Sequence, residues 1–160
     1  MATKTNAVRL VQQAGIPCRE AFYEFDEQDL SGVHAAQAVG MPEEQVFKTL
    51  VARGEKTGIN VFCIPVCCEL DLKKAAKAAG DKNMELVAVK ELLGLTGYIR
   101  GGCSPVGMKK PVPPVFHETV VLFESICVSA GKIGHQVEVD PAVLMDFLGA
   151  TAADLTVEGK

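Results

Sequence analysis

The sequence predicts an α+β fold, with one domain over residues 1–160 built on a mixed, mostly antiparallel, barrel-like sheet flanked by helices. Three observations predict it. Helix and strand signals are mixed along the chain without the strict alternation of an α/β protein. Two pairs of β-branched runs are joined by glycine-containing bends, which is typical of hairpins. With 160 residues, 48% of them hydrophobic and 22% charged, the chain can bury a core of ordinary size.

The N-terminal part predicts a helix, a strand and a second helix. Residues 5–15 carry apolar residues at helical spacing, and Thr5 can cap the first turn. Residues 18–25, "CREAFYEF", are aromatic and partly alternating, which favours a strand. Residues 31–40, "SGVHAAQAVG", predict a helix capped by Ser31.

The middle of the chain predicts a hairpin, a helix, and then a short strand with a helix. The β-branched runs 46–53 and 59–66 are separated by "GEKTG", a strong hairpin signal. Residues 70–80, "LDLKKAAKAAG", place alanines on one face of a helix. Residues 84–94 predict a short strand followed by a helix that ends at Gly94.

The C-terminal part predicts an extended segment, a second hairpin and a final helix. Residues 111–118, "PVPPVFHE", are extended but unsuited to a central strand because of their prolines. Residues 125–139 predict a hairpin that bends at "AGKIG". In residues 140–149, Asp140 caps a helix and Pro141 opens its first turn.

Charge and composition exclude several classes of protein. The formal net charge of −4 is opposite to that of a strongly basic nucleic-acid binder, so any polyanion must be met by a local patch. We expect a cytoplasmic protein with no membrane contact, because the sequence shows neither a signal peptide nor a membrane span. In that compartment the six cysteines are expected to be reduced thiols; they are Cys18, Cys63, Cys67, Cys68, Cys103 and Cys127.

The cysteine spacing does not indicate a metal site. Cys63, Cys67 and Cys68 form no pair of C-x-x-C motifs, and no histidine lies at ligand spacing. Small buried thiols are the favoured interpretation. A redox role for Cys67 and Cys68 is a weaker alternative, because adjacent cysteines rarely form unstrained disulfides.

The segment 97–110, "GYIRGGCSPVGMKK", is the first candidate functional element. Gly101 and Gly102 can turn backbone amides toward a carbonyl or an anion, which would suit an oxyanion in acyl transfer. A tight connection that needs glycine only to turn is an equal alternative. Cys103 has no visible base to activate it, so packing is its default role. Ser104 lacks a nucleophile-elbow motif and suits a supporting role.

Lys48 is the second candidate. In the run "QVFKTLVA" it shares a strand face with Val46 and Leu50. A half-buried ammonium at a cleft would hold a phosphate or polarise a carbonyl. The alternative is an edge-strand lysine that discourages aggregation. The lysines at positions 73, 74 and 77 are expected to form a solvated helix face.

Read together, these elements resemble a known family. "VFKTLV", "LDLKKAAKAAG", "TGYIRGGCSPVGMKK" and "VSAGKIGHQVEV" occur in this order. The sequence from about residue 7 to residue 148 resembles the YbaK family of aminoacyl-tRNA deacylases, which share a fold with the editing insertion of bacterial prolyl-tRNA synthetases. The resemblance implies a free-standing editing enzyme that hydrolyses mischarged tRNA without a metal or nucleotide cofactor. The substrate it implies most strongly is Cys-tRNA(Pro). It also implies attack by the substrate's own thiol, giving a cyclic thioester.

The resemblance also implies site residues. Lys48 would anchor the phosphate or ester region of the terminal adenosine. Gly101, Gly102 and Ser104 would join it around the reacting carbonyl. The positions expected to bind substrate are Tyr23, Asp26, Leu30, Arg100, Cys103, Lys132 and Gln136.

Two departures from the family pattern bear on specificity. Gln136 stands where the deacylases best known for cysteine carry an aspartate, and Leu30 or Ser31 stands near a family phenylalanine. The preferred aminoacyl group therefore stays open, as does the oligomeric state. The expected partners are the aminoacylated 3′ end of tRNA and prolyl-tRNA synthetase. The alternatives are a deacylase for another aminoacyl-tRNA, and a non-catalytic module that binds a tRNA end, a nucleotide or a synthetase.

Overall fold

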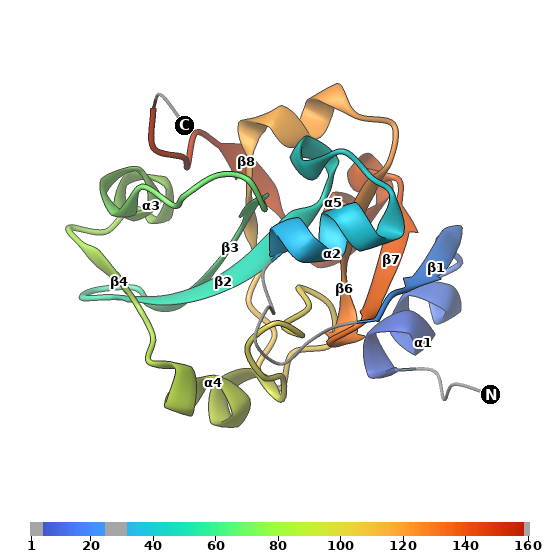
Figure 1. Ribbon diagram of the computed structural model, residues 1–160. Coiled ribbons are helices and arrows are strands. Elements are labelled where there is room, and N and C mark those ends of the chain that lie inside the picture. The colour runs from blue at the N-terminus through green and yellow to red at the C-terminus, as the bar shows by residue number, and fades with distance from the viewer. Residues whose placement is uncertain (1–4, 25–31, 159–160) are drawn as a thin grey trace.

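A computed structural model describes residues 5–24 and 32–158 (Figure 1). The smaller of its two sheets has three strands in the order β1-β7-β6, and both pairings are antiparallel. The strands are β1 (Cys18–Phe22), β6 (Ile126–Lys132) and β7 (His135–Val139). The hairpin predicted at 125–139 is confirmed as β6 and β7, with an irregularity between Ser129 and Lys132.

The larger sheet has five strands in the order β4-β2-β3-β5-β8. The predicted first hairpin forms its centre, with Phe47 paired to Pro65 and Gly54 to Gly58. β4 pairs antiparallel with β2, whereas β5 and β8 add in parallel. The sheets are therefore mixed and mostly antiparallel, as predicted. The strands are β2 (Phe47–Gly54), β3 (Gly58–Pro65), β4 (Met84–Leu86), β5 (Val115–His117) and β8 (Thr151–Ala153).

The helices lie where the sequence predicts them. They are α1 (Asn6–Gln13), α2 (Gly32–Val39), α3 (Leu72–Ala79), α4 (Val89–Thr96) and α5 (Pro141–Leu148), with 3₁₀ turns at Glu43–Gln45 and Glu118–Leu122. Thr5, Asp71 and Asp140 cap α1, α3 and α5 through their side chains. Within the described residues, no helix is both long and apolar enough to cross a membrane.

The two sheets meet along β2 and β6. A parallel bridge joins Val46 to Cys127 at that junction. β4 pairs with β2 only from Ala52 to Gly54. The edge of β2 between these two contacts has no strand partner among the described residues, so the barrel-like arrangement is not closed there.

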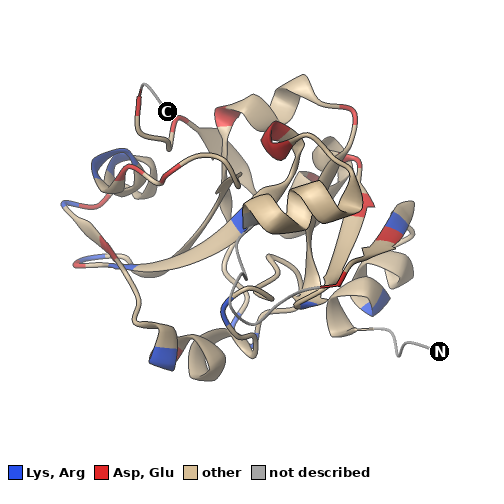
Figure 2. Ribbon diagram, viewed as in Figure 1, with Lys and Arg blue, Asp and Glu red and all other residues tan. Residues whose placement is uncertain are grey.

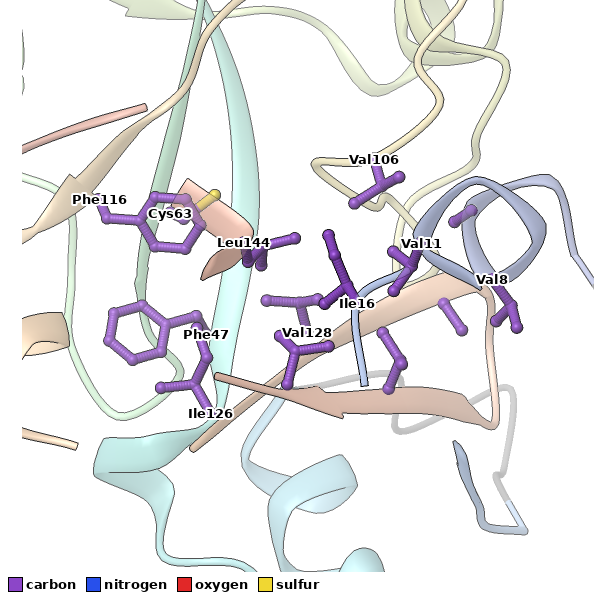
Figure 3. Close-up of a cluster of buried hydrophobic side chains, with 14 of the residues drawn as sticks. Val8, Val11, Ile16, Phe47, Cys63, Val106, Phe116, Ile126, Val128 and Leu144 are labelled. Carbon is purple, nitrogen blue, oxygen red and sulfur yellow. The ribbon is translucent and has the colours of Figure 1, made fainter. Parts of the chain in front are cut away.

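The largest group of buried side chains packs against one face of the three-stranded sheet (Figure 3). Val8 and Val11 of α1 pack toward Val128 of β6, while Phe47 and Phe116 bring in the five-stranded sheet. The two phenylalanine rings are tilted, with centroids 5.9 Å apart. One core therefore ties both sheets together and holds β2 against β6.

Three details differ from the sequence prediction. α4 runs through Gly94 to Thr96, and Gly97 (φ 85°) is the residue that ends it. Residues 111–118 were expected to avoid a central strand, yet β5 lies between β3 and β8. The prolines precede β5, so its three residues keep the N–H groups that a ladder needs. β8 was not predicted, because its short run "TAA" carries no strand pattern.

Candidate functional site

A cavity of about 470 Å³ opens along the unpaired edge of β2. Its walls come from β2, α2, the segment after β4, the glycine-rich loop and the β6–β7 hairpin. The polar and charged groups in its lining, with the glycine and cysteine of the loop, are Tyr23, Lys48, Thr49, Arg100, Gly101, Cys103, Ser129 and Gln136. Lys48 of β2 and Gly101 of the glycine-rich loop therefore border one cavity.

Strand register explains why the polar groups meet. Ser129 of β6 is paired with Gln136 of β7. The Val46–Cys127 bridge between β2 and β6 is parallel, so two residues further along both strands Lys48 comes level with Ser129. Lys48, Ser129 and Gln136 thus form a row across the junction of the two sheets.

Lys48 is half-buried in this row. Burial lowers the pKa of its ammonium below the usual lysine value, and the nearby Cys68, Glu69 and Cys67 partly oppose that shift. Lys48 forms no ion pair with any residue that the structure describes. A partly desolvated ammonium that has no carboxylate partner among these residues can interact with the negative charge of a ligand. β2 pairs with β3 along its whole length but with β4 only from Ala52 to Gly54, so Lys48 lies on the stretch of β2 whose other edge borders the cavity.

Gln136 borders the same cavity and carries a buried acceptor atom without a partner among the described residues. Its side chain is only 6% exposed, and its Oε1 has no hydrogen-bond partner among the described residues. A buried carbonyl oxygen without a donor costs about 1–3 kcal/mol. A ligand that brings an N–H or O–H group would remove this cost.

The glycine-rich loop is held by side chains of its own segment. The Tyr98 hydroxyl donates to the Val106 carbonyl, and the Tyr98 ring lies over Gly131, where a Cβ would come within 2.9 Å of the ring. Thr96 Oγ1 accepts a hydrogen bond from the Tyr98 N–H at 3.0 Å. Burial raises the pKa of Tyr98 to about 12, so the phenol stays protonated as a donor.

The two adjacent glycines have different structural roles. Gly101 has φ of 87°, a conformation that favours glycine, and lines the cavity. Its N–H donates to no backbone carbonyl of the described residues. The Gly102 N–H donates to the Ile99 carbonyl at 3.0 Å, so its amide is already occupied. A Cβ at Gly102 would lie 3.1 Å from the Ile133 nitrogen, so this glycine allows the loop to approach the β6–β7 turn.

Two further predicted residues lie outside the cavity lining. Ser104 is fully buried, and its hydroxyl oxygen accepts the Val106 N–H at 3.1 Å, which stabilises the loop from within. Lys132 is exposed at the β6–β7 turn, with its backbone against Gly102. Neither residue borders the cavity.

The buried cysteines are poor nucleophiles. Burial raises the pKa of Cys103 to about 11, and the same cause raises the pKa values of Cys63 and Cys127 to about 12. Cys103 packs with Val51 and Tyr98 and also lines the cavity. These thiols stay protonated at neutral pH, in line with a packing role.

The cavity lining contains six of the predicted residues, which are Tyr23, Lys48, Arg100, Gly101, Cys103 and Gln136. Asp26 and Leu30 fall outside the described residues. Sequence reasoning missed Thr49 and Ser129, which border the cavity beside Lys48 and Gln136. Both stand inside the motifs "VFKTLV" and "VSAGKIGHQVEV", so those motifs held the signal.

A second polar cluster lies at the other end of the larger sheet. One ligand atom from each of His117, Glu118 and Asp154 lies within 4.8 Å of the others. The Nδ1 atom of His117 accepts the Leu155 N–H at 3.1 Å, and Asp154 pairs with Lys74 at 2.9 Å. Two of the three groups are therefore already engaged in bonds within the protein.

The part of the sequence that builds this cavity matches a known family. The family model of the aminoacyl-tRNA editing domain matches residues 30–147. The chain belongs to the aminoacyl-tRNA editing domain family. Every described residue that lines the cavity, apart from Tyr23, lies within the matched span.

Individual relatives agree with this assignment. EbsC of Enterococcus faecalis, a candidate Cys-tRNA(Pro)/Cys-tRNA(Cys) deacylase, is 44% identical over 155 residues, which cover 97% of this chain and 94% of EbsC. A proline–tRNA ligase of Cupriavidus necator is 24% identical over 137 residues, 79% of this chain and 24% of the ligase.

A solved structure shares the whole fold. The crystal structure of a candidate trans-editing enzyme for prolyl-tRNA synthetase superposes with a TM-score of 0.79 at 28% identity. The match covers 97% of this chain and 99% of that one. The editing-domain fold predicted from the sequence is confirmed.

Proposed function

We propose that this editing domain hydrolyses mischarged aminoacyl-tRNA in trans, with Cys-tRNA(Pro) as its first candidate substrate. The observation that carries the proposal is the meeting of Lys48 and Gly101 at one cavity. The cavity volume of about 470 Å³ lies within the range of small-ligand sites. It would receive the aminoacyl group and part of the terminal adenosine. The likeness to EbsC supports the same activity.

The bond to be broken is the ester between the amino-acid carbonyl and a ribose oxygen. When a nucleophile attacks the carbonyl carbon, negative charge develops on the carbonyl oxygen. The Lys48 ammonium and the Gly101 N–H are the groups in this cavity that would stabilise that charge. Lys48 has no ion pair within the described residues, so the substrate would not have to displace a carboxylate of those residues from it.

The nucleophile would come from the substrate or from water. The protein thiol in the cavity, Cys103, has its pKa raised to about 11 by burial, so it does not supply a thiolate at neutral pH. In cysteinyl-tRNA the substrate's own thiol can attack the carbonyl. A carbon–sulfur bond then forms, the ester C–O bond breaks, and the thiol proton leaves with the ribose oxygen. Holding these atoms in line is the contribution of the cavity.

The unpartnered Oε1 of Gln136 would accept a hydrogen bond from the substrate's α-amino group. Thr49 and Ser129 border the same space and offer hydroxyls to the ester region. A second site of this kind serves translation, because a synthetase pocket rejects a similar-sized amino acid only weakly.

A substrate panel tests the proposal. Wild-type protein would be incubated with Cys-, Ala-, Ser- and Pro-tRNA(Pro), and release of the amino acid measured, with Lys48→Ala in parallel. We expect hydrolysis of Cys-tRNA(Pro) and a large loss in the variant. Equal rates for the two proteins would remove Lys48 from the mechanism. No turnover of any aminoacyl-tRNA, with binding retained, would favour a non-catalytic module.

A further inference from the structure

Charge is distributed unevenly along this chain. Residues 92–117 contain no Asp or Glu, but they contain Arg100, Lys109 and Lys110. Residues 118–158 contain seven acidic residues and one lysine, Lys132. A protein of formal net charge −4 therefore has a long segment whose formal charges are all positive.

The fold brings these cations to α4, the glycine-rich loop and the turn beside that loop. Arg100 borders the cavity itself. Lys132, the lone cation of the acidic segment, has its backbone within 3.3 Å of a Cβ placed on Gly102. Lys109 is tied to α4 by its N–H, which donates to the Thr96 carbonyl at 2.9 Å. Together with Lys90 of α4, these side chains form what we call the basic rim, and all are exposed: Lys90, Arg100, Lys109, Lys110 and Lys132.

Within the described residues, α4 and the glycine-rich loop carry one acidic side chain, Glu91. On α4, Glu91 accepts from the Arg53 guanidinium at 3.3 Å and is neutralised there. Figure 2 shows basic residues on α4 and on the loops beside it, and acidic residues on the short helices at the top of the view. The basic residues of α4 and of these loops thus lie on one side of the molecule, although α3 carries others.

Exposed apolar side chains lie beside the cations. Leu86 and Val89 line the cavity and are 49% and 60% exposed. Leu93 follows Val89 by one helical turn and is 55% exposed, and Ile99 lies just after α4. A surface that combines cations with apolar side chains is suited to unpaired nucleotides, which offer both phosphates and bases.

We propose that the basic rim and the apolar face of α4 are the docking surface for the unpaired acceptor end of the tRNA. This inference rests on the proposed function and names the surface that the rest of the substrate uses. The terminal aminoacyl-adenosine occupies the cavity, and the preceding nucleotides cross α4 and the glycine-rich loop. Their phosphates meet the lysines, and their bases or riboses meet Leu86, Val89 and Leu93.

The acidic segment has a complementary role. Negative charge on the short helices at the top of Figure 2 would repel RNA there and favour an approach of the tRNA end from the side of α4. A local basic patch of this kind explains how a protein of net negative charge can bind a polyanion. Binding by so few cations is weak and strongly dependent on salt.

A pair of charge reversals tests the surface. Lys109→Glu/Lys110→Glu removes two cations that lie outside the cavity lining. Lys73→Glu/Lys77→Glu on α3 is the matched control, because it changes the net charge equally and its lysines are also exposed. The readout is kcat/KM for full-length Cys-tRNA(Pro) and for a cysteinyl ester of adenosine, which lacks the preceding phosphates.

We expect the rim variant to lose roughly tenfold in kcat/KM with tRNA and to keep the wild-type value with the adenosine ester. For this variant, the slope of log(kcat/KM) against the logarithm of the salt concentration should become shallower by about 0.7 for each phosphate that it no longer neutralises. The α3 control should match the wild type on both substrates. A second variant, Lys109→Gln/Lys110→Gln, removes the two charges without reversing them and should show an intermediate loss in kcat/KM. It serves as a check in case the reversal variant misfolds.

The outcomes separate the two proposals. If wild-type protein cleaves Cys-tRNA(Pro) and the rim variant cleaves it equally well, the docking surface is wrong and the proposed function stands. An equal loss in the α3 control would reveal a general charge effect and also overturn the surface. If no protein cleaves either substrate but tRNA binding falls only in the rim variant, the surface stands and the enzymatic function fails.

Discussion

Two polar clusters on the larger sheet differ in how their groups are satisfied. Around His117, the ring nitrogen Nδ1 receives the Leu155 N–H, and the carboxylate of Asp154 receives the Lys74 ammonium. In the cavity, neither the Lys48 ammonium nor Oε1 of Gln136 has a partner of this kind within the described protein.

This difference indicates that the His117 cluster stabilises the fold and that the cavity groups serve ligand binding. Groups that are bonded within the protein, such as His117 and Asp154, contribute to the free energy of folding and are not available to a ligand. An unsatisfied cluster lowers stability and keeps its interactions for the substrate or its transition state. Substitutions in the cavity should therefore reduce activity without reducing stability, and substitutions in the His117 cluster should do the reverse.

The largest effect is expected at Lys48. Lys48→Met keeps the length of the side chain and removes the charge. The rate of Cys-tRNA(Pro) hydrolysis should fall by about 10²–10³-fold, the size seen when one oxyanion donor is removed. The melting temperature should stay the same or rise, because a desolvated ammonium is removed. Single-turnover hydrolysis and thermal unfolding measure the two quantities, and a strong drop in melting temperature would contradict the comparison.

The second effect is expected at His117. His117→Ala leaves the buried N–H of Leu155 without an acceptor, which costs about 1–3 kcal/mol of unfolding free energy. Urea denaturation measures this loss. His117→Asn is the matched control, since its Oδ1 can take the place of Nδ1. The rate per folded molecule should not change in either variant, and a lower rate with unchanged stability would reverse the assignment.

A third, smaller effect is expected at Gln136. Gln136→Met fills the same space without the unpartnered oxygen. Stability should stay level or increase, while kcat/KM should fall about tenfold, the worth of one hydrogen bond to the substrate. Steady-state kinetics with Cys-tRNA(Pro) checks the activity. An unchanged kcat/KM would show that Oε1 does not contact substrate.

Much of the fold was predictable from the sequence, because its signals are local. Asp71 and Asp140 mark helix starts, and "GEKTG" and "AGKIG" mark hairpin bends. β5 and β8 were not predictable in the same way, because short parallel strands depend on neighbours that lie far away in the sequence.

The candidate site was predictable in part. Lys48 and Gly101 stood out as a lysine in an apolar strand and a glycine in a loop. Thr49 and Ser129 did not, because a hydroxyl in a strand is common and only the junction of β2 with β6 brings these two together. Gly102 resembled its neighbour in sequence, yet the structure uses its amide in a turn. Backbone hydrogen bonding of this kind has no signature in residue type.

The smallest expected effect is the pH dependence of stability at His117. Burial lowers the pKa of the imidazole below 6.5, although Asp154 and Glu118 oppose the shift and Lys74 adds to it. Between the lowered pKa and 6.5, the unfolded chain binds more protons than the folded protein, so the unfolding free energy decreases as pH falls through this window.

His117→Asn cannot titrate and should lose that part of the slope. Urea denaturation of both proteins between pH 7 and about pH 5 measures this slope. Asp154 stays ionised in that range, because pairing with Lys74 lowers the pKa of its carboxyl. Parallel curves for the two proteins would mean that the ring is not held neutral. The neutral ring, with Nδ1 as acceptor, is the feature that makes this cluster a structural one.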